Sequence, residues 1–184
     1  YMQWDLIEKP KRRDALIKAL QHRLKEVEKR LNNNKVAEQL LNDVKEAVTK
    51  FADWFPQQIL LRAKVTKRLK KICREDNNDF DGLSRVAHAT DATDWRVELP
   101  LVVLKPDNEQ ETIEMVEACI ELGLTIIPRG GGTGYTGGAI PLHADTVVIN
   151  TEKLEYLGLV EQVELPQIGK VATVKTGAGG VTRR

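Results

Sequence analysis

The stretch that decides the fold is Pro128-Arg-Gly-Gly-Gly-Thr-Gly-Tyr-Thr-Gly-Gly138, which directly follows an apolar run of strand type. Six of the ten residues from Arg129 to Gly138 are glycine, so few backbone angles are barred and no Cβ blocks a ligand. Successive amides of such a loop can turn inward around an anion, and Arg129 with the loop hydroxyls adds donors suited to phosphate oxygens. A flexible surface loop is disfavoured, because ordering so many glycines carries a large entropic cost. We therefore predict a loop that wraps a diphosphate.

Two well-known phosphate loops are alternatives to this interpretation. A Walker A loop needs a lysine after its last glycine, and the residue after Gly137 is another glycine. The string Gly-x-Gly-x-x-Gly of a dinucleotide fold is matched by residues 132–137, but it must open a helix whose N-terminus faces the pyrophosphate. Residues 139–145 contain a proline and are too short for a helix. Both alternatives are therefore disfavoured.

Strand and helix patterns surround the loop and predict an α+β fold. A helix capped by Asp107 or Asn108 carries its apolar residues three and four apart and ends before Gly123. The expected elements are a strand at 101–104, this helix to residue 122, strands at 124–127 and 146–149, and a hairpin of strands at 158–165 and 170–176. The first two strands with their helix form a βαβ unit, so we expect them to be parallel with a right-handed crossover.

The first part of the chain has a different character. Residues 1–75 hold 19 Lys and Arg against 10 Asp and Glu, whereas residues 76–184 hold 9 against 17. Apolar stripes predict helices at 14–31, 36–54 and 57–74, with Pro56 ending one helix or opening the next. We therefore predict a basic helical region over residues 1–75 and a second domain over residues 76–184.

The order of these pieces resembles a known family. Asp91-Ala-Thr-Asp-Trp-Arg96, Pro100-Leu-Val-Val-Leu-Lys-Pro106, an acidic helix, the glycine loop and Val147-Val-Ile-Asn150 are similar to the FAD domain of the vanillyl-alcohol-oxidase (PCMH) type. Within it, the bacterial FAD-linked dehydrogenases of D-lactate, glycolate and other 2-hydroxy acids are most similar. The resemblance covers about residues 84–180.

The resemblance implies a cofactor, a site and an activity. The FAD pyrophosphate would be held by Pro128, Arg129, Gly130, Gly131, Gly132, Thr133, Gly134, Tyr135, Thr136, Gly137 and Gly138. Some relatives carry a histidine here that bonds covalently to the flavin, and Thr133 occupies that place, so non-covalent FAD is expected. The parent protein would be an FAD-dependent dehydrogenase or oxidase of a small-molecule 2-hydroxy acid. Its catalytic residues would lie beyond Arg184, so we expect residues 1–184 alone to be inactive.

The basic residues at 57–74 admit three interpretations. A face that is solvated or packs on the acidic second domain is favoured. Peripheral membrane contact through residues 57–74 is second, and nucleic-acid binding is disfavoured because no aromatic residues alternate with the charges. A non-enzymatic module that binds a partner or a membrane through these helices is the alternative function. Neither Cys73 nor Cys119 belongs to a metal motif. A reducing, cytoplasmic setting, with the inner membrane face as a variant, is the expected location.

Overall fold

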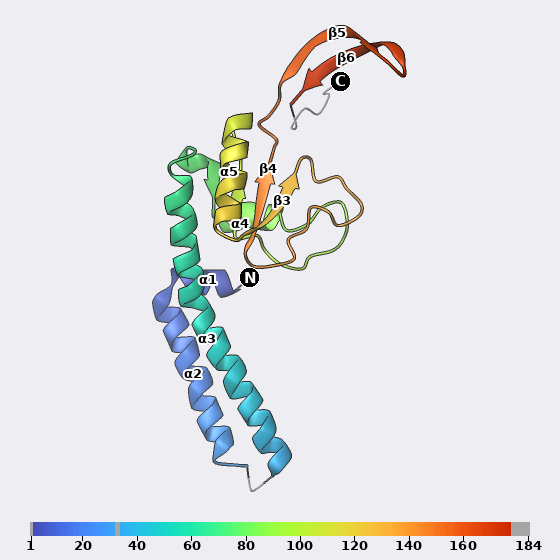
Figure 1. Cartoon of the computed structure of the whole chain (residues 1–184). Helices are drawn as coiled ribbons and strands as arrows, with labels where there is room; N and C mark the ends of the chain where they lie inside the picture. The colour runs from blue at the N-terminus through green and yellow to red at the C-terminus, as the bar shows by residue number, and fades with distance from the viewer. Residues whose placement is uncertain (1, 32–33, 178–184) are drawn as a thin grey trace. The chain divides into compact units, whose positions relative to one another are not determined.

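The computed structural model describes residues 2–31 and 34–177, and the chain divides into two compact units, Tyr1–Lys64 and Val65–Arg184 (Figure 1). The helices of the first unit are α1 (Met2–Glu8), α2 (Pro10–Glu28) and α3 (Lys35–Leu69), whose last turn belongs to the second unit. The second unit contains a short 3-10 helix η1 (Glu75–Asn77), β1 (Asn78–Asp79), α4 (Gly82–Ala87), β2 (Val102–Leu104), α5 (Glu109–Glu121), β3 (Thr125–Arg129), β4 (Thr146–Asn150), β5 (Leu157–Leu165) and β6 (Gly169–Thr176). Helices and a mixed sheet together confirm the predicted α+β class.

The first unit is built on a helical hairpin. Helices α2 and α3 lie side by side and run in opposite directions (Figure 1). Leu41 and Phe55 of α3 are buried, and the ring of Phe55 lies edge-on to that of Phe51 with centroids 4.9 Å apart. Every described residue of α2 keeps some exposure, so this pair of helices encloses only a narrow core.

The prediction of two helices separated at Pro56 is wrong. Helix α3 is continuous from Lys35 to Leu69 with Pro56 inside it. The residues on its inner stripe, Phe51, Phe55 and Gln58, keep the helical spacing through the proline and are buried or half-buried. A proline inside a helix costs about 3 kcal/mol, and burial of an apolar stripe on both sides of it offsets that cost. Helix α3 also ends five residues before the predicted end at Arg74.

The second unit is centred on a four-stranded sheet with the order β1-β2-β4-β3. Strands β2 and β3 both run parallel to β4, with Val103 opposite Val148 and Ile127 also opposite Val148. The expected parallel arrangement of the strands that flank α5 is therefore confirmed, and β4 lies between them. Strand β1 pairs with β2 in the antiparallel sense. Strands covered on both faces carry unbroken apolar runs, and every residue of β2 and β4 is buried.

Helix α5 begins where the sequence predicts it. The Asn108 side chain accepts a hydrogen bond from the amide of Glu111 at 2.9 Å, and the Glu111 carboxylate accepts one from the amide of Asp107 at 3.0 Å. This reciprocal pair satisfies two amides at the N-terminus of the helix. Its face toward the sheet buries Met115 and Ala118 completely. Gly123, at φ +66°, ends the segment in the left-handed conformation that favours glycine.

Strands β5 and β6 form a separate two-stranded antiparallel sheet, as predicted for a hairpin. The cross-strand pairs include Val160 with Val174 and Glu164 with Lys170. Most side chains of this hairpin are exposed. A two-stranded sheet has little stability of its own in water, so the hairpin depends on what packs against it.

Two arginines that the sequence places in the basic region pair with carboxylates inside the second unit. Arg68 contacts Glu121 at 2.8 Å, and Arg74 contacts Asp107 at 2.8 Å. In the parts of the chain that the structure describes, no helix has the length and apolar character needed to cross a membrane. The compact units divide at Lys64, and the domain boundary at residues 75 and 76 stays a prediction.

Candidate diphosphate site at the carboxyl edge of the sheet

The glycine loop leaves the sheet at the carboxyl end of β3. Because β2, β3 and β4 are parallel, the segments that follow them meet at one edge of the sheet, which is where ligands bind in open parallel sheets. The loop is fixed at its start, where the amide of Thr151, just after β4, donates to the carbonyl of Arg129 at 2.9 Å. The two segments after β3 and β4 are therefore held together at this edge.

The backbone of the loop is rich in unused donors. No amide from Gly130 to Gly138 donates a hydrogen bond to another residue in the described part of the chain. Most of the loop is exposed. Gly132 and Gly137 adopt φ values of +66° and +73°, a conformation in which consecutive amides can form an anion-binding nest. Gly134 faces open space, since a Cβ built there meets no atom within 4 Å. These features fit a phosphate-bearing group that approaches the backbone closely.

The side chain of Arg129 has a role that sequence analysis missed. Its Nη1 donates to the carbonyl of Thr90 at 2.6 Å. The guanidinium also lies against Gly132, where a Cβ would come within 2.6 Å of its Cζ. Partial burial lowers the pKa of Arg129, and the carboxylate of Asp91 acts in the opposite direction. Arg129 therefore braces the loop from within, whereas the sequence favoured a direct donor to phosphate.

A segment before β2 supports the far end of the loop. The ring of Trp95 lies 3.4 Å from the position that a Cβ on Gly137 would occupy. The amide of Glu98 donates to the carbonyl of Pro141 at 3.2 Å. Asp91 accepts from the amide and hydroxyl of Thr93 at 2.9 and 2.6 Å, and these bonds lower the pKa of its carboxyl. The stretch from Asp91 to Arg96 thus packs against the glycine loop and supports it.

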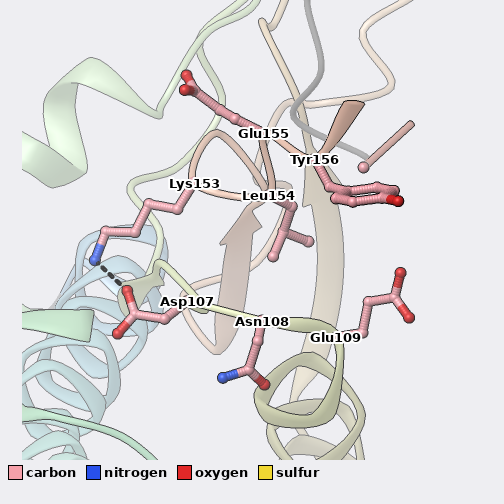
Figure 2. Close-up of a pocket in the computed structure, with 8 residues that line it drawn as sticks. Asp107, Asn108, Glu109, Lys153, Leu154, Glu155 and Tyr156 are labelled. Carbon is pink, nitrogen blue, oxygen red and sulfur yellow. Dashed lines mark hydrogen bonds and ion pairs between the residues drawn. The ribbon is translucent and has the colours of Figure 1, made fainter. Parts of the chain in front are cut away.

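A pocket of about 400 Å³ lies at the same edge of the sheet, between the N-terminus of α5 and the residues that follow β4 (Figure 2). Figure 2 shows Lys153 and Asp107 meeting on one side of this pocket and Tyr156 and Glu109 on the other. Its lining residues are Asp107, Asn108, Glu109, Lys153, Leu154, Glu155, Tyr156 and Gly177. Sequence reasoning did not find this pocket, because its walls are distant in the chain and no motif joins them.

A network of charges closes one wall of the pocket. Lys153 donates to Asn77 at 2.6 Å and to Asp107 at 2.9 Å. The side chain of Asn77, together with Lys153 and Arg74, lowers the pKa of Asp107 to about 2. The single lysine of the lining is thus already paired with Asp107, and the carboxylates of Glu109 and Glu155 remain beside this pair. A diphosphate dianion would meet net negative charge here, so the pocket does not suit it.

His88 acts as a structural link behind the site. Its Nδ1 lies 2.7 Å from the backbone carbonyl of Ser84, and its Nε2 lies 2.9 Å from the side-chain amide nitrogen of Asn150 at the end of β4. The ring therefore donates through Nδ1 and accepts through Nε2, which is the neutral form. Burial lowers its pKa, in agreement with that assignment.

Two segments of the chain match models of known protein families. Residues 100–181 match a family model described as "FAD binding domain", and residues 1–53 match one described as "Protein of unknown function (DUF3683)". The match over residues 100–181 includes β2, α5, β3, the glycine loop and β4. Residues 100–181 are thus similar to an FAD-binding domain, and the prediction of FAD as the cofactor is confirmed.

Curated relatives extend the same similarity. A protein of Schizosaccharomyces pombe named as a candidate mitochondrial D-lactate dehydrogenase is 28% identical over 130 residues, covering 66% of this chain and 23% of that protein. The glycolate oxidase subunit GlcD of Bacillus subtilis is 26% identical over 113 residues, covering 61% and 23%. The solved structure of an alkyldihydroxyacetonephosphate synthase superposes with a TM-score of 0.48 at 20% identity, covering 54% of this chain and 22% of that one.

The predicted resemblance to FAD-linked 2-hydroxy-acid dehydrogenases is thus confirmed at the level of sequence. The chain spans 23% of the length of each of the two curated relatives described above.

Proposed function

We propose that residues 128–138 hold the pyrophosphate of FAD through backbone amides. The observation that carries this proposal is the row of amides from Gly130 to Gly138 without a partner in the described chain. Two left-handed glycines and the open space at Gly134 support it, since a bound phosphate needs donors that nothing else uses and a backbone it can approach. Arg129 would serve mainly to hold the loop in that conformation.

The glycine loop is a better diphosphate site than the neighbouring pocket. The loop offers neutral amide donors with Arg129 behind them, whereas the pocket has Asp107, Glu109 and Glu155 around a lysine that is already paired. Charge alone therefore favours the loop, even though the pocket has the more enclosed shape. We keep the expectation that FAD is bound without a covalent link at Thr133, because a threonine hydroxyl lacks the nucleophilic ring nitrogen of histidine.

For the whole protein we propose oxidation of a 2-hydroxy acid. Support comes from the relatives, which are named for D-lactate and for glycolate. When bound, FAD supplies the hydride acceptor for such an oxidation. The contribution of this chain is to bind and orient the diphosphate end of the cofactor. The groups that bind the acid and remove its proton are expected beyond Arg184.

The test uses the whole protein that carries this sequence, purified without added cofactor. We expect a visible flavin spectrum that bleaches on anaerobic mixing with D-lactate, glycolate or D-2-hydroxyglutarate. Bleaching by one acid and not by its mirror-image form would identify the substrate. A colourless protein would contradict the cofactor proposal. A yellow protein that none of these acids reduces would contradict only the proposed substrate class.

We also propose a reducing compartment, the cytoplasm, for this protein, supported by the free thiols of Cys73 and Cys119. Peripheral membrane contact through residues 57–74 has less support. Three of its basic side chains have carboxylate partners, since Arg62 lies 3.7 Å from Glu8 and Arg68 and Arg74 pair within the second unit.

A further inference from the structure

One flank of the α2–α3 hairpin in the first unit remains apolar and exposed. The large apolar side chains exposed on these two helices before Pro56 are Leu16, Val27, Val36, Leu40 and Val44. Single exposed apolar residues need no explanation, but a continuous group of them marks an interaction surface.

Helical geometry places them on the same side of the hairpin. Successive residues turn by about 100° around a helix, so Leu16 and Val27 lie on one border of the α2 stripe that faces α3, and Glu28 lies on the other. Lys45 of α3 pairs with Glu28 at 2.6 Å and marks that other side. In antiparallel helices the corresponding border of α3 then carries Val44, Leu40 and Val36, which face the same way as Leu16 and Val27. We call these five residues the apolar flank.

Helix α1 shows what kind of segment such a flank accepts. At the end of the hairpin where α2 begins, α1 buries Leu6 and Ile7. Its carboxylates pair with arginines of both helices of the hairpin: Asp5 contacts Arg12 at 2.6 Å, and Glu8 lies 3.7 Å from Arg62. By the same turn of about 100° per residue, both arginines lie on the side of the apolar flank. An amphipathic helix with acidic borders therefore already covers one end of this side.

The uncovered end offers the same chemistry. Arg23 lies on the border of α2 between Leu16 and Val27, is exposed, and has no ion-pair partner among the described residues. On α3 the flank residues themselves are apolar, and the nearest carboxylate, Asp43, already accepts a hydrogen bond from Gln39 at 2.9 Å. Apolar side chains beside an arginine without an ion-pair partner repeat the combination that receives Leu6, Ile7 and Asp5 at the end of the hairpin covered by α1.

We propose that the apolar flank binds an amphipathic helix with acidic borders from a partner protein, laid against the parts of α2 and α3 that α1 leaves uncovered. A flat anionic membrane fits this surface less well. Packed helices lie about 8–10 Å apart, so α1 projects from the same side by roughly that distance and would hold a flat surface away from Leu40. A helix fits beside α1 without this conflict. The proposal concerns the first unit and does not depend on flavin binding.

The test measures fluorescence anisotropy of two synthetic peptides with the full chain of residues 1–184. Both peptides have about 20 residues, enough to form a helix, and carry a leucine stripe at spacings of three and four. One has glutamates on the borders of the stripe, and the other has lysines. The variants are Leu40→Asp with Leu60→Asp as its control, because both leucines lie on α3 and are 63% and 62% exposed. Arg23→Glu and its control Lys25→Glu test the charge.

We expect the acidic peptide to bind and the basic peptide to bind at least about tenfold more weakly. Leu40→Asp should weaken binding by about tenfold or more, the loss typical of a residue central to an interface. Leu60→Asp should change it by less than about twofold, as at a position outside the contact. Arg23→Glu should reverse the preference between the peptides, while Lys25→Glu should preserve it. Circular dichroism confirms that each variant keeps its helices.

Several results would overturn the proposal. Equal binding of the two peptides, no binding of the acidic one, or an equal loss in the Leu60→Asp protein would each do so. A concentration-dependent dimer in sedimentation that Leu40→Asp dissociates would show that a second copy occupies the flank. If the protein co-sediments with phosphatidylserine-containing vesicles and Leu40→Asp abolishes this co-sedimentation, then a membrane occupies the flank.

Discussion

Replacing Gly132 by alanine tests whether the Arg129 side chain stabilises the glycine loop. Gly132 has φ +66°, and a Cβ at this position would lie 2.6 Å from Cζ and 2.9 Å from Nε of Arg129. Something must therefore move, and the guanidinium is the mobile partner. Its displacement would break the 2.6 Å hydrogen bond from Arg129 to the carbonyl of Thr90.

The expected loss of stability has two parts. A non-glycine residue in the left-handed conformation costs about 1–2 kcal/mol. Losing a hydrogen bond from a charged donor costs about 1.5–3 kcal/mol, and the lower end applies because Arg129 is only half-buried and water can replace Thr90. We therefore expect Gly132→Ala to lower the free energy of unfolding by about 2–4 kcal/mol.

Urea denaturation followed by circular dichroism measures this loss, and Gly134→Ala is the matched control in the same loop. Gly134 has no positive φ, and a Cβ there meets no atom within 4 Å, so its replacement should change stability by less than about 0.5 kcal/mol. Equal stability of the two variants would refute the idea that Arg129 braces the loop through Gly132.

Three further predictions concern pH and reactivity. The folded protein holds the pKa of Asp107 at about 2, below the ordinary value of about 3.9. The ion pairs of Asp107 should therefore stabilise the fold above about pH 4, and this stabilisation should be lost as the pH falls toward 2. In an acid titration followed by circular dichroism, Asp107→Asn should remove this pH-dependent loss. Burial lowers the pKa of His88, so below about pH 6.5 the unfolded chain takes up the proton before the folded protein does. The urea midpoint of unfolding should therefore fall as the pH drops below that value. An equally steep fall of the midpoint in the His88→Gln protein would contradict this. Burial raises the pKa of Cys119 to about 11, so iodoacetamide at about pH 8 should leave it unmodified in the native protein and alkylate it in urea, as mass spectrometry would record.

The sequence predicts the centre of the second unit well because local and global signals agree there. Strand β2 is wholly apolar, β4 has the apolar centre Val147-Val-Ile149, and Asn108 supplies the cap that starts α5. Pro56 misled the prediction of the helices, because a local preference against proline was outweighed by packing along α3. Strand β1 was missed since it has only two residues, Asn78 and Asp79, and both are polar.

The candidate site was predictable in its backbone but not in its side chains. Glycine content and the preceding strand were enough to locate the loop. The bond from Arg129 to Thr90 joins residues 39 apart, and no local pattern announces it. The contact of Trp95 with Gly137 and the pocket between Asp107 and Tyr156 likewise depend on how distant segments meet at the edge of the sheet.

The central claim is that the glycine loop holds the diphosphate of FAD through its backbone, and retention of flavin by two variants of the whole protein tests it most directly. Gly134→Leu places a side chain in the open space beside the unpartnered amides, and Gly82→Leu places the same side chain in open space on α4. Both proteins should fold, as judged by circular dichroism. We predict that Gly82→Leu retains FAD as the parent does and that Gly134→Leu loses its visible flavin absorbance. A yellow Gly134→Leu protein with unchanged affinity for FAD would contradict the account.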